Sequence, residues 1–216
     1  MIIAIAGQKG GSGKSTLAVH LAAEWSARGK RVLLVDADVQ GTSLTWSEVA
    51  DENGNEPPDT VAVGDNLRRV VPALASAYDV TVIDCPGRRE SKRQLGALLC
   101  ADIAVLPCGP STPDVWALAE SVEMVVEVQE LRPRLRACIV VNRLGNDGES
   151  RAALDALAAL PIPLSTTHLG RRVAFSEALA AGRGVTVDQP KSIAAAELSQ
   201  LADELETLEE VADAAA

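Results

Sequence analysis

The strongest constraint on the fold of this chain is a set of five short runs that are apolar at nearly every position. Such runs suit strands buried on both faces, as in a parallel sheet covered by helices. Longer stretches with helical length and periodic apolar residues lie between them. We therefore predict an α/β fold with a doubly wound, mostly parallel sheet and helices on both faces. The predicted strands are 2–6, 31–36, 80–84, 103–107 and 137–142, and the predicted helices are 15–28, 113–131, 150–160 and 192–208.

The length of 216 residues and an apolar share of 47% fit one globular domain, which we place at residues 1–208. The acidic, alanine-rich end, residues 209–216, is expected to fray. The polar stretch 51–59, DENGNEPPD, is predicted to be a loop. The N-terminal MIIAIAG is too short for a signal peptide, and no run approaches the roughly 20 apolar residues of a membrane span. A cytoplasmic protein is expected.

Cysteine and histidine give no sign of a metal centre. The four cysteines lack C-x-x-C spacing, and the two histidines lie far apart in the sequence. Buried, reduced thiols are the expected state of the cysteines.

The net charge of −10 is unevenly distributed. Residues 192–216 hold seven acids and no base, so the rest of the chain carries −3. Bases gather in that remainder at 88–93, at 132–136 and at Arg171 and Arg172. These clusters could form a basic face for a polyanion, or they could be ordinary solvated charges.

A glycine-rich stretch, GQKGGSGKST at residues 7–16, follows the first predicted strand and opens the first predicted helix. This order is typical of a phosphate-binding loop, in which glycines turn successive N–H groups towards an anion at a helix N-terminus. Lys14 would reach the β- and γ-phosphates of ATP, and Ser15 would bind Mg²⁺. Gln8 stands where the strict pattern has glycine. The expected nucleotide-binding residues are Gly10, Gly11, Ser12, Gly13, Lys14, Ser15 and Thr16.

Polar side chains also end three other predicted strands. Asp84 ends VTVID, where a carboxylate can hold Mg²⁺ opposite the phosphates. Asp36 and Asp38 follow RVLLV, and one could lie near the metal while the other positions a water or caps a turn. Asn142 ends ACIVVN, and its amide could pair with the edge of adenine. We thus predict an ATP and Mg²⁺ site of the P-loop NTPase class.

These motifs together resemble the ParA/MinD family of deviant Walker A ATPases across almost the whole chain. KGGSGKST with Lys9 is similar to the deviant Walker A motif, VDADVQ to switch I, VIDCPG to Walker B and VVNR to the adenine-reading strand. The resemblance is greatest to the short ParA partition ATPases, because the chain starts at its first strand without room for an N-terminal helix-turn-helix domain. Val39 departs from the family pattern, which has proline there.

The resemblance implies an ATP-dependent sandwich homodimer in which Lys9 reaches the phosphates of the partner's ATP. Lys9, Lys14 and Asp38 would be catalytic, with Asp38 positioning the water, while Ser15 and Asp84 hold Mg²⁺ with Asp36 as an outer partner. It also implies nonspecific DNA binding, nucleoid association and a ParB-like or other cargo adaptor that stimulates hydrolysis. Arg171, Arg172 and Arg183 are the candidate DNA contacts. Alternatively, Lys9 is a surface lysine that neutralises its own nucleotide.

Other functions remain to be weighed against this one. A MinD-like membrane ATPase would need a basic amphipathic C-terminal helix, but the sequence after residue 192 is acidic, so no membrane binding is expected. An iron–sulfur reductase of related fold would need two cysteines at a dimer seam, and Cys85 and Cys108 lack suitable surroundings. An ATP-dependent clamp without hydrolysis is opposed by Asp38.

Overall fold

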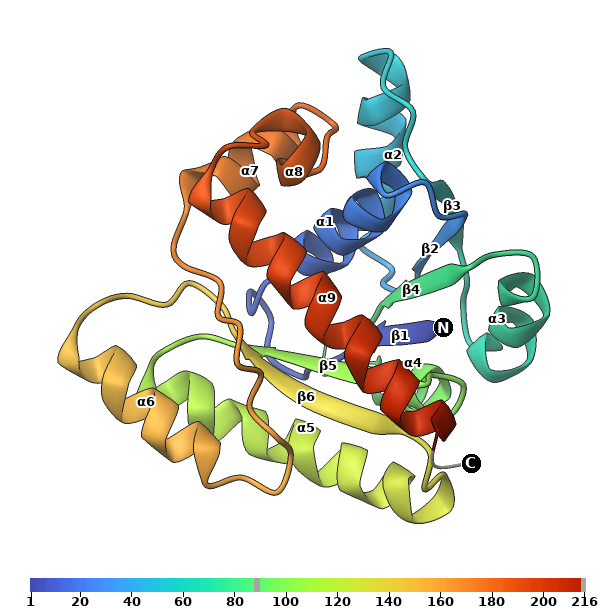
Figure 1. Ribbon diagram of the computed structural model, residues 1–216. Coiled ribbons are helices and arrows are strands. Elements are labelled where there is room, and N and C mark those ends of the chain that lie inside the picture. Colours follow the sequence, from blue (N-terminus) through green and yellow to red (C-terminus); the bar gives the residue numbers. More distant parts are fainter. Residues whose placement is uncertain (88–89, 215–216) are drawn as a thin grey trace.

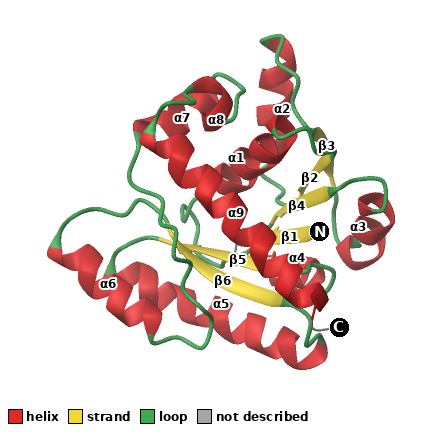
Figure 2. Cartoon of the chain, viewed as in Figure 1, coloured by secondary structure: helices red, strands yellow, loops and turns green. Residues whose placement is uncertain are grey.

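The computed structural model describes residues 1–87 and 90–214, with side chains described up to residue 210. Within this part of the chain, six parallel strands form one sheet in the order β3-β2-β4-β1-β5-β6. Helices cover both faces (Figures 1 and 2), so the predicted fold class is confirmed. The strands are β1 (Ile2–Ile5), β2 (Val32–Asp36), β3 (Asp59–Ala62), β4 (Val80–Asp84), β5 (Ile103–Cys108) and β6 (Arg136–Val141). The helices are α1 (Lys14–Ala27), α2 (Thr42–Glu52), α3 (Leu67–Ala75), α4 (Ser91–Leu98), α5 (Thr112–Leu131), α6 (Gly148–Ala158), α7 (Val173–Ala180), α8 (Val185–Asp188) and α9 (Ile193–Ala214).

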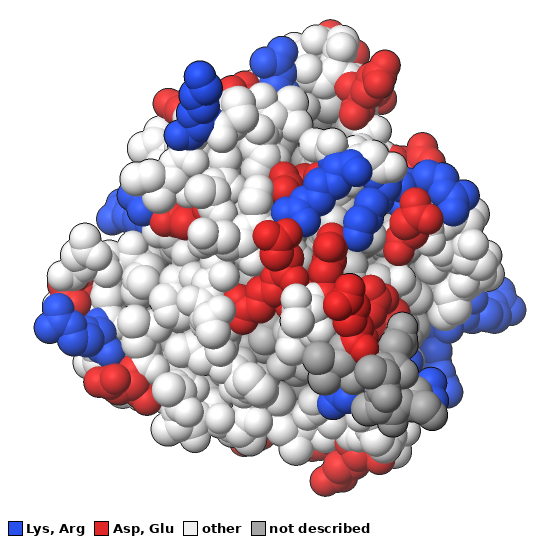
Figure 3. Space-filling model, viewed as in Figure 1, with Lys and Arg blue, Asp and Glu red and all other residues white. Residues whose placement is uncertain are grey.

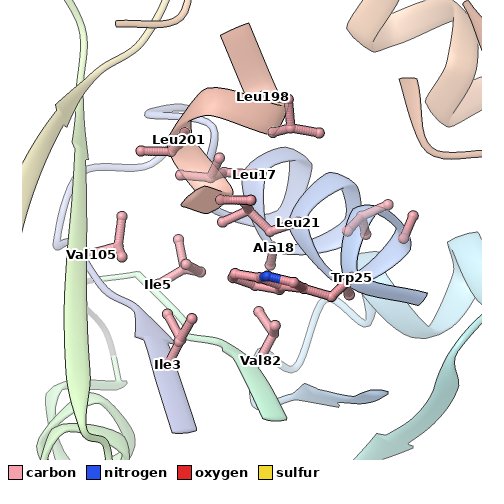
Figure 4. Packing of buried hydrophobic residues seen from close by; sticks show 14 of the residues in the cluster. Ile3, Ile5, Leu17, Ala18, Leu21, Trp25, Val82, Val105, Leu198 and Leu201 are labelled. Atoms are coloured by element: carbon pink, nitrogen blue, oxygen red, sulfur yellow. The ribbon is translucent and has the colours of Figure 1, made fainter. Parts of the chain in front are cut away.

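Each face of the sheet has its own core, because successive strand residues point to opposite sides. Ile3 and Ile5 belong to a core that includes buried residues of α1, α7, α8 and α9, whereas Ala4 belongs to a core that includes buried residues of α3, α4, α5 and α6. Figure 4 shows the first core, where Trp25 of α1 lies over Ile5 and Val82. Strands buried on both faces have no solvent side, which explains why their sequences are continuously apolar.

The parallel arrangement brings the carboxyl ends of the strands to one edge of the sheet. Ile5 is in register with Asp84, and Asp84 is in register with Asp36. The glycine-rich loop therefore leaves β1 beside the aspartates that end β4 and β2. This edge of an open α/β sheet is the usual place for a ligand.

The structure adds elements that the sequence pattern did not predict. Helix α2 extends to Glu52 and strand β3 begins at Asp59, so the predicted loop 51–59 shrinks to the turn between them. Strand β3 pairs only with β2 and its four residues are exposed or partly exposed, so it carries little of the apolar signal that marks the inner strands. Helices α3, α4, α7 and α8 are short and bury few residues each.

Helix α9 runs to Ala214, six residues beyond the predicted domain boundary at 208, and residues 215 and 216 lie outside the described part. Glu209 is held by an ion pair of 3.2 Å with the N-terminal amine of Met1, which anchors the helix past that boundary. The acids of α9 lie next to bases of the α1 end, as Figure 3 shows: Asp203 pairs with Arg28 and Glu206 pairs with Lys30.

The expectation that the cysteines are buried, reduced thiols is confirmed. All four cysteines are buried free thiols. Within the described residues, none of the helices combines the length and the apolar composition needed to cross a bilayer.

Candidate functional site

The loop between β1 and α1 has the backbone shape of an anion cradle. Gly11 and Gly13 have φ values of 75° and 92°, in the left-handed region that glycine favours. Gly13 is the N-cap of α1, so the loop ends where a helix N-terminus presents its free N–H groups. Gly10 is outside the left-handed region. The loop bends at Gly11 and Gly13, which both have a left-handed backbone.

Lys14 lies inside this loop with only 7% of its surface exposed. Its Nζ donates a hydrogen bond of 3.1 Å to the carbonyl oxygen of Lys9. Burial lowers the pKa of Lys14 below its ordinary value, although the nearby Asp84 opposes this change. A buried ammonium gains most from an anion placed beside it, and a phosphate group at the loop would supply that charge.

The second lysine of the loop behaves differently. The Nζ of Lys9 lies 2.5 Å from Oδ1 of Asp114, in the first turn of α5, and 38% of the Lys9 side chain is exposed. Burial would raise the pKa of Asp114, but hydrogen bonds from Lys9 and Ser111 outweigh it, and the pKa falls below its usual value. Lys9 is thus held at the protein surface by its own chain, away from the position that Lys14 occupies.

Asp84 has a free oxygen at the centre of the site. Its Oδ2 accepts a hydrogen bond of 2.8 Å from Ser43 of α2, whereas the buried Oδ1 has no hydrogen-bond partner among the described residues. Burial raises the pKa of Asp84 to about 7, against the nearby hydroxyl groups of Ser43 and Ser15, which lower it. An unpaired buried carboxylate oxygen next to a serine hydroxyl fits a bound cation.

The described residues hold no group of three or more His, Cys, Asp and Glu side chains able to bind a metal by themselves. Mg²⁺ at nucleotide sites usually keeps several waters and takes one or two protein ligands together with phosphate oxygens. The pair Ser15 and Asp84 fits that kind of site.

The other two aspartates organise the loop after β2. Asp36 is buried, and its two carboxylate oxygens accept backbone hydrogen bonds from Asp38 and Leu44, each of 3.0 Å. Asp38 is half-buried and accepts a hydrogen bond of 3.0 Å from the N–H of Gln40. Asp36 therefore shapes the segment 36–44, while Asp38 stands at the border between the protein and solvent.

A cavity of about 350 Å³ adjoins the glycine-rich loop. Gly13 and Thr16 form one wall, and Asn142 lies between this cavity and the loop because its Nδ2 donates a hydrogen bond of 3.1 Å to the carbonyl of Ser12. Arg143 also lines the cavity and is the one non-glycine residue with positive φ, 60°, in the described part of the chain. Seven of the predicted residues, from Gly10 to Thr16, thus meet Asn142, Asp84 and Asp36 at one edge of the sheet.

The three candidate DNA arginines do not lie together. Arg171 and Arg172 line the cavity, and Arg172 forms an ion pair of 2.7 Å with Glu197. Arg183 lines a separate hollow near α2, where it donates a hydrogen bond to Asn55. The basic stretch 132–136 leads into β6 at the opposite edge of the sheet, and residues 88 and 89 of the stretch 88–93 lie outside the described residues.

Sequence patterns did not reveal several residues of the site. Three of them belong to helices that follow strand ends, and each bonds to a residue far away in the sequence. Ser43 lies 41 residues from its partner Asp84, Asp114 lies 105 from Lys9, and Gln94 lies 87 from Gly7. Ser43 lies only a few residues after the aspartates of VDADVQG, and this closeness in sequence was the one sign that it could belong to the site.

Comparison with known proteins finds relatives of this chain. A family model described as the CobQ/CobB/MinD/ParA nucleotide binding domain matches residues 3–185. The carboxysome distribution protein A of Halothiobacillus neapolitanus is 29% identical over 85% of each chain, and the chromosome-partitioning ATPase Soj of Thermus thermophilus is 30% identical over 94% of each. Among solved structures, MinD of Pyrococcus horikoshii with Mg-ADP has a TM-score of 0.75 at 22% identity, covering 98% of each chain.

Proposed function

Since the chain belongs to the CobQ/CobB/MinD/ParA family of nucleotide-binding domains, we propose that it is a ParA-type, Mg²⁺-dependent ATPase. ATP binding joins two copies in a sandwich dimer that binds nonspecific DNA. Hydrolysis, stimulated by an adaptor protein on the cargo, separates the copies. The cycle would position a plasmid, a chromosome or another cargo. The names of the relatives, which concern carboxysome distribution and chromosome partitioning, support a positioning role without choosing among these cargoes.

The observation that carries this proposal is that the two lysines of the loop differ in burial and in partner. Lys14 is buried inside the loop, where an ammonium serves the nucleotide of its own chain. Lys9 is partly exposed and paired with Asp114, so it can reach a second molecule once it leaves that carboxylate. An ammonium supplied in trans would stabilise charge on the transferred phosphoryl group only after two copies meet. Trp116, two residues after Asp114 and 72% exposed, offers apolar surface for the same contact.

We assign the remaining residues roles that agree with their positions. The N–H groups of the loop bind phosphate oxygens, and Asn142 borders the cavity that would hold the adenine. Ser15 and Asp84 would hold Mg²⁺, which offsets negative charge on the phosphates when bound. Asp38 orients the attacking water, and Asp36 fixes the backbone that carries Asp38.

The experiment that tests the dimer is light scattering of the full chain with ADP and with ATP plus Mg²⁺. The wild type should be monomeric with ADP and dimeric with ATP. Asp38→Ala should accumulate as the dimer because hydrolysis no longer separates the copies. Lys9→Ala should weaken the ATP dimer by at least about tenfold, because each protomer loses a charged contact worth about 1.5 to 3 kcal/mol.

Lys30→Ala is the matched control, since it removes an equally charged side chain that pairs with Glu206 on α9. It should dimerise as the wild type does. If the wild type and both site variants stay monomeric with either nucleotide, Lys9 has no role in trans, and an ordinary phosphate-loop enzyme replaces the ParA-type mechanism.

DNA binding should depend strongly on salt and on Arg171. Because each neutralised phosphate releases counterions, removing one arginine from each protomer should reduce the slope of log affinity against log salt by about two. Fluorescence anisotropy with a random-sequence duplex and ATP, from 50 to 200 mM salt, measures this slope for the wild type and Arg171→Ala. Arg31→Ala is the control, because Arg31 precedes β2 at the opposite edge of the sheet. Affinity that does not fall with salt would contradict the electrostatic contact.

The membrane-bound alternative receives no support from α9. Its acids pair with Arg28 and Lys30, and an acidic surface is repelled by anionic lipid.

A further inference from the structure

The first turn of α4 connects three loops that surround the candidate nucleotide site. Two consecutive residues, Arg93 and Gln94, make these connections. Arg93 belongs to the basic stretch 88–93, which in the sequence looks like surface charge. Its side chain is nevertheless only 20% exposed, and Gln94 is 1% exposed.

Arg93 connects α4 to the loop after β2. Its Nη1 donates a hydrogen bond of 3.2 Å to the carbonyl oxygen of Ala37, the residue between Asp36 and Asp38. The same guanidinium forms an ion pair of 2.7 Å with Glu90 and donates from Nε to Asp65 at 2.7 Å. Three partners from three segments fix its planar fork in one orientation.

Gln94 connects the same helical turn to the glycine-rich loop and to the segment after β4. Its Nε2 donates a hydrogen bond of 2.9 Å to the carbonyl of Gly7 and another to the carbonyl of Pro86. The loop that would bind phosphate and the strand end that carries Asp84 thus share one amide. Because Gln94 is fixed to both, Arg93 restrains Ala37 relative to the phosphates and not only relative to α4.

We propose that Arg93 is a positioning residue that sets the place of Asp38 for hydrolysis by holding the carbonyl of Ala37. The inference rests on the proposed function, in which Asp38 orients the attacking water. The backbone N–H groups of Ala37 and Asp38 already bond to Asp84 and Asp36, and Arg93 adds the contact to the carbonyl of Ala37. Val39 and Gln40 beyond Asp38 are exposed. Misplacement of a reacting group by about 1 Å can cost about 100-fold in rate.

The electrostatics agree with this placement. The hydrogen bond to Asp65 is the largest of the effects that raise the pKa of Arg93, and Glu90 and Asp38 contribute as well. The guanidinium therefore interacts electrostatically with Asp38, although its hydrogen bond goes to the carbonyl of Ala37.

The test compares Arg93→Met and Arg93→Lys with Lys92→Met. Methionine keeps the length of the side chain without a donor, whereas lysine keeps the charge but cannot span Ala37 and Asp65 together. Lys92 is the exposed neighbour on the same helical turn, so Lys92→Met is a matched control for lost charge. Phosphate release gives kcat, titration with a fluorescent ATP analogue gives Kd, and light scattering gives the dimer.

We expect kcat to fall about tenfold in Arg93→Met and to recover partly in Arg93→Lys, with Kd and the dimer within twofold of wild type. Lys92→Met should hydrolyse ATP as the wild type does. Wild-type kcat in both Arg93 variants would overturn the inference. So would a fall in kcat that is accompanied by an equal loss of ATP affinity. Arg93→Lys decides the question if Arg93→Met does not fold. Asp38→Ala separates the two claims, because its full activity would remove the proposed function itself.

Discussion

Replacement of Gly13 by alanine should weaken ATP binding by about 30- to 100-fold. Gly13 has φ of 92°, where a residue with a Cβ costs about 1 to 2 kcal/mol. A Cβ there would also lie 2.2 Å from Nδ2 of Asn142. That amide cannot move without losing its hydrogen bond to Ser12, worth about 1 kcal/mol. The free loop of the variant can avoid these costs by leaving the conformation that binds phosphate, so ATP binding must restore it at a cost of about 2 to 3 kcal/mol, and about 1.4 kcal/mol corresponds to tenfold in affinity. Titration calorimetry with ATP and Mg²⁺ measures the change.

The loop supplies its own controls for this prediction. Gly11 has φ of 75° but open space around the position of a Cβ, so Gly11→Ala introduces backbone strain alone. Gly10 has neither a left-handed backbone nor a neighbour within 4 Å, so Gly10→Ala should weaken ATP binding least of the three. Affinity should therefore fall in the order Gly10→Ala, Gly11→Ala, Gly13→Ala. Equal losses in all three would mean that a Cβ disturbs the phosphate contacts directly and that neither strain nor Asn142 controls the effect.

The fold could be predicted where burial of an element makes its sequence apolar. Strands β1, β2, β4, β5 and β6 match the predicted runs within about a residue at each end, because strands covered on both faces must be apolar throughout. Strand β3 was missed because it lies at the sheet edge with exposed residues. Helix α2 was missed because only Ser43, Trp46 and Ala50 of its residues are buried, too few to establish a period.

The site was predictable where a motif fixes the backbone, and less so where contacts join distant segments. The loop from Gly10 to Thr16 and the aspartates that end strands follow from the chain order and the parallel sheet. The partner of Lys9 does not, because Asp114 lies 105 residues away and no local pattern distinguishes it from other acids. The same is true of Arg93, whose inward contacts run against the surface character of a basic cluster.

The structure shows that Asp114 of the same chain would compete with the phosphates of a second copy for Lys9. In one chain the ammonium is neutralised by a carboxylate that is itself stabilised by Ser111. Lys9 must leave this carboxylate to reach another molecule, so part of any gain from a contact in trans offsets the lost ion pair. The proposed dimer would therefore depend on a strongly negative ligand such as the triphosphate, since a weaker anion competes poorly with Asp114.

His20 connects the site to the C-terminal third of the chain. It lies on α1, fully buried, beside the cavity. Its Nδ1 accepts a hydrogen bond of 3.1 Å from the N–H of Val185 at the start of α8, so the proton resides on Nε2, which donates to the carbonyl of Phe175 in α7 at 2.9 Å. Burial lowers the pKa of His20 to about 4, although the hydrogen bond with Phe175 opposes this change. A neutral ring is required, because a protonated Nδ1 could not accept from Val185.

Wild-type stability should therefore contain a contribution from His20 that disappears in acid. The unfolded chain binds this proton near pH 6.5 and the folded chain only near pH 4, so the contribution is complete above pH 6.5 and is lost as the pH falls to 4. The difference corresponds to about 3 kcal/mol. Urea unfolding between pH 7.5 and 4 measures it against His20→Gln, whose amide can still donate to Phe175 but leaves Val185 unpaired. At pH 7.5 the variant should be less stable by about 1 to 3 kcal/mol. That gap should shrink on acidification, because all other titrating groups are common to both chains. A gap that stays constant down to pH 4 would mean that the folded protein does not hold His20 in the neutral form.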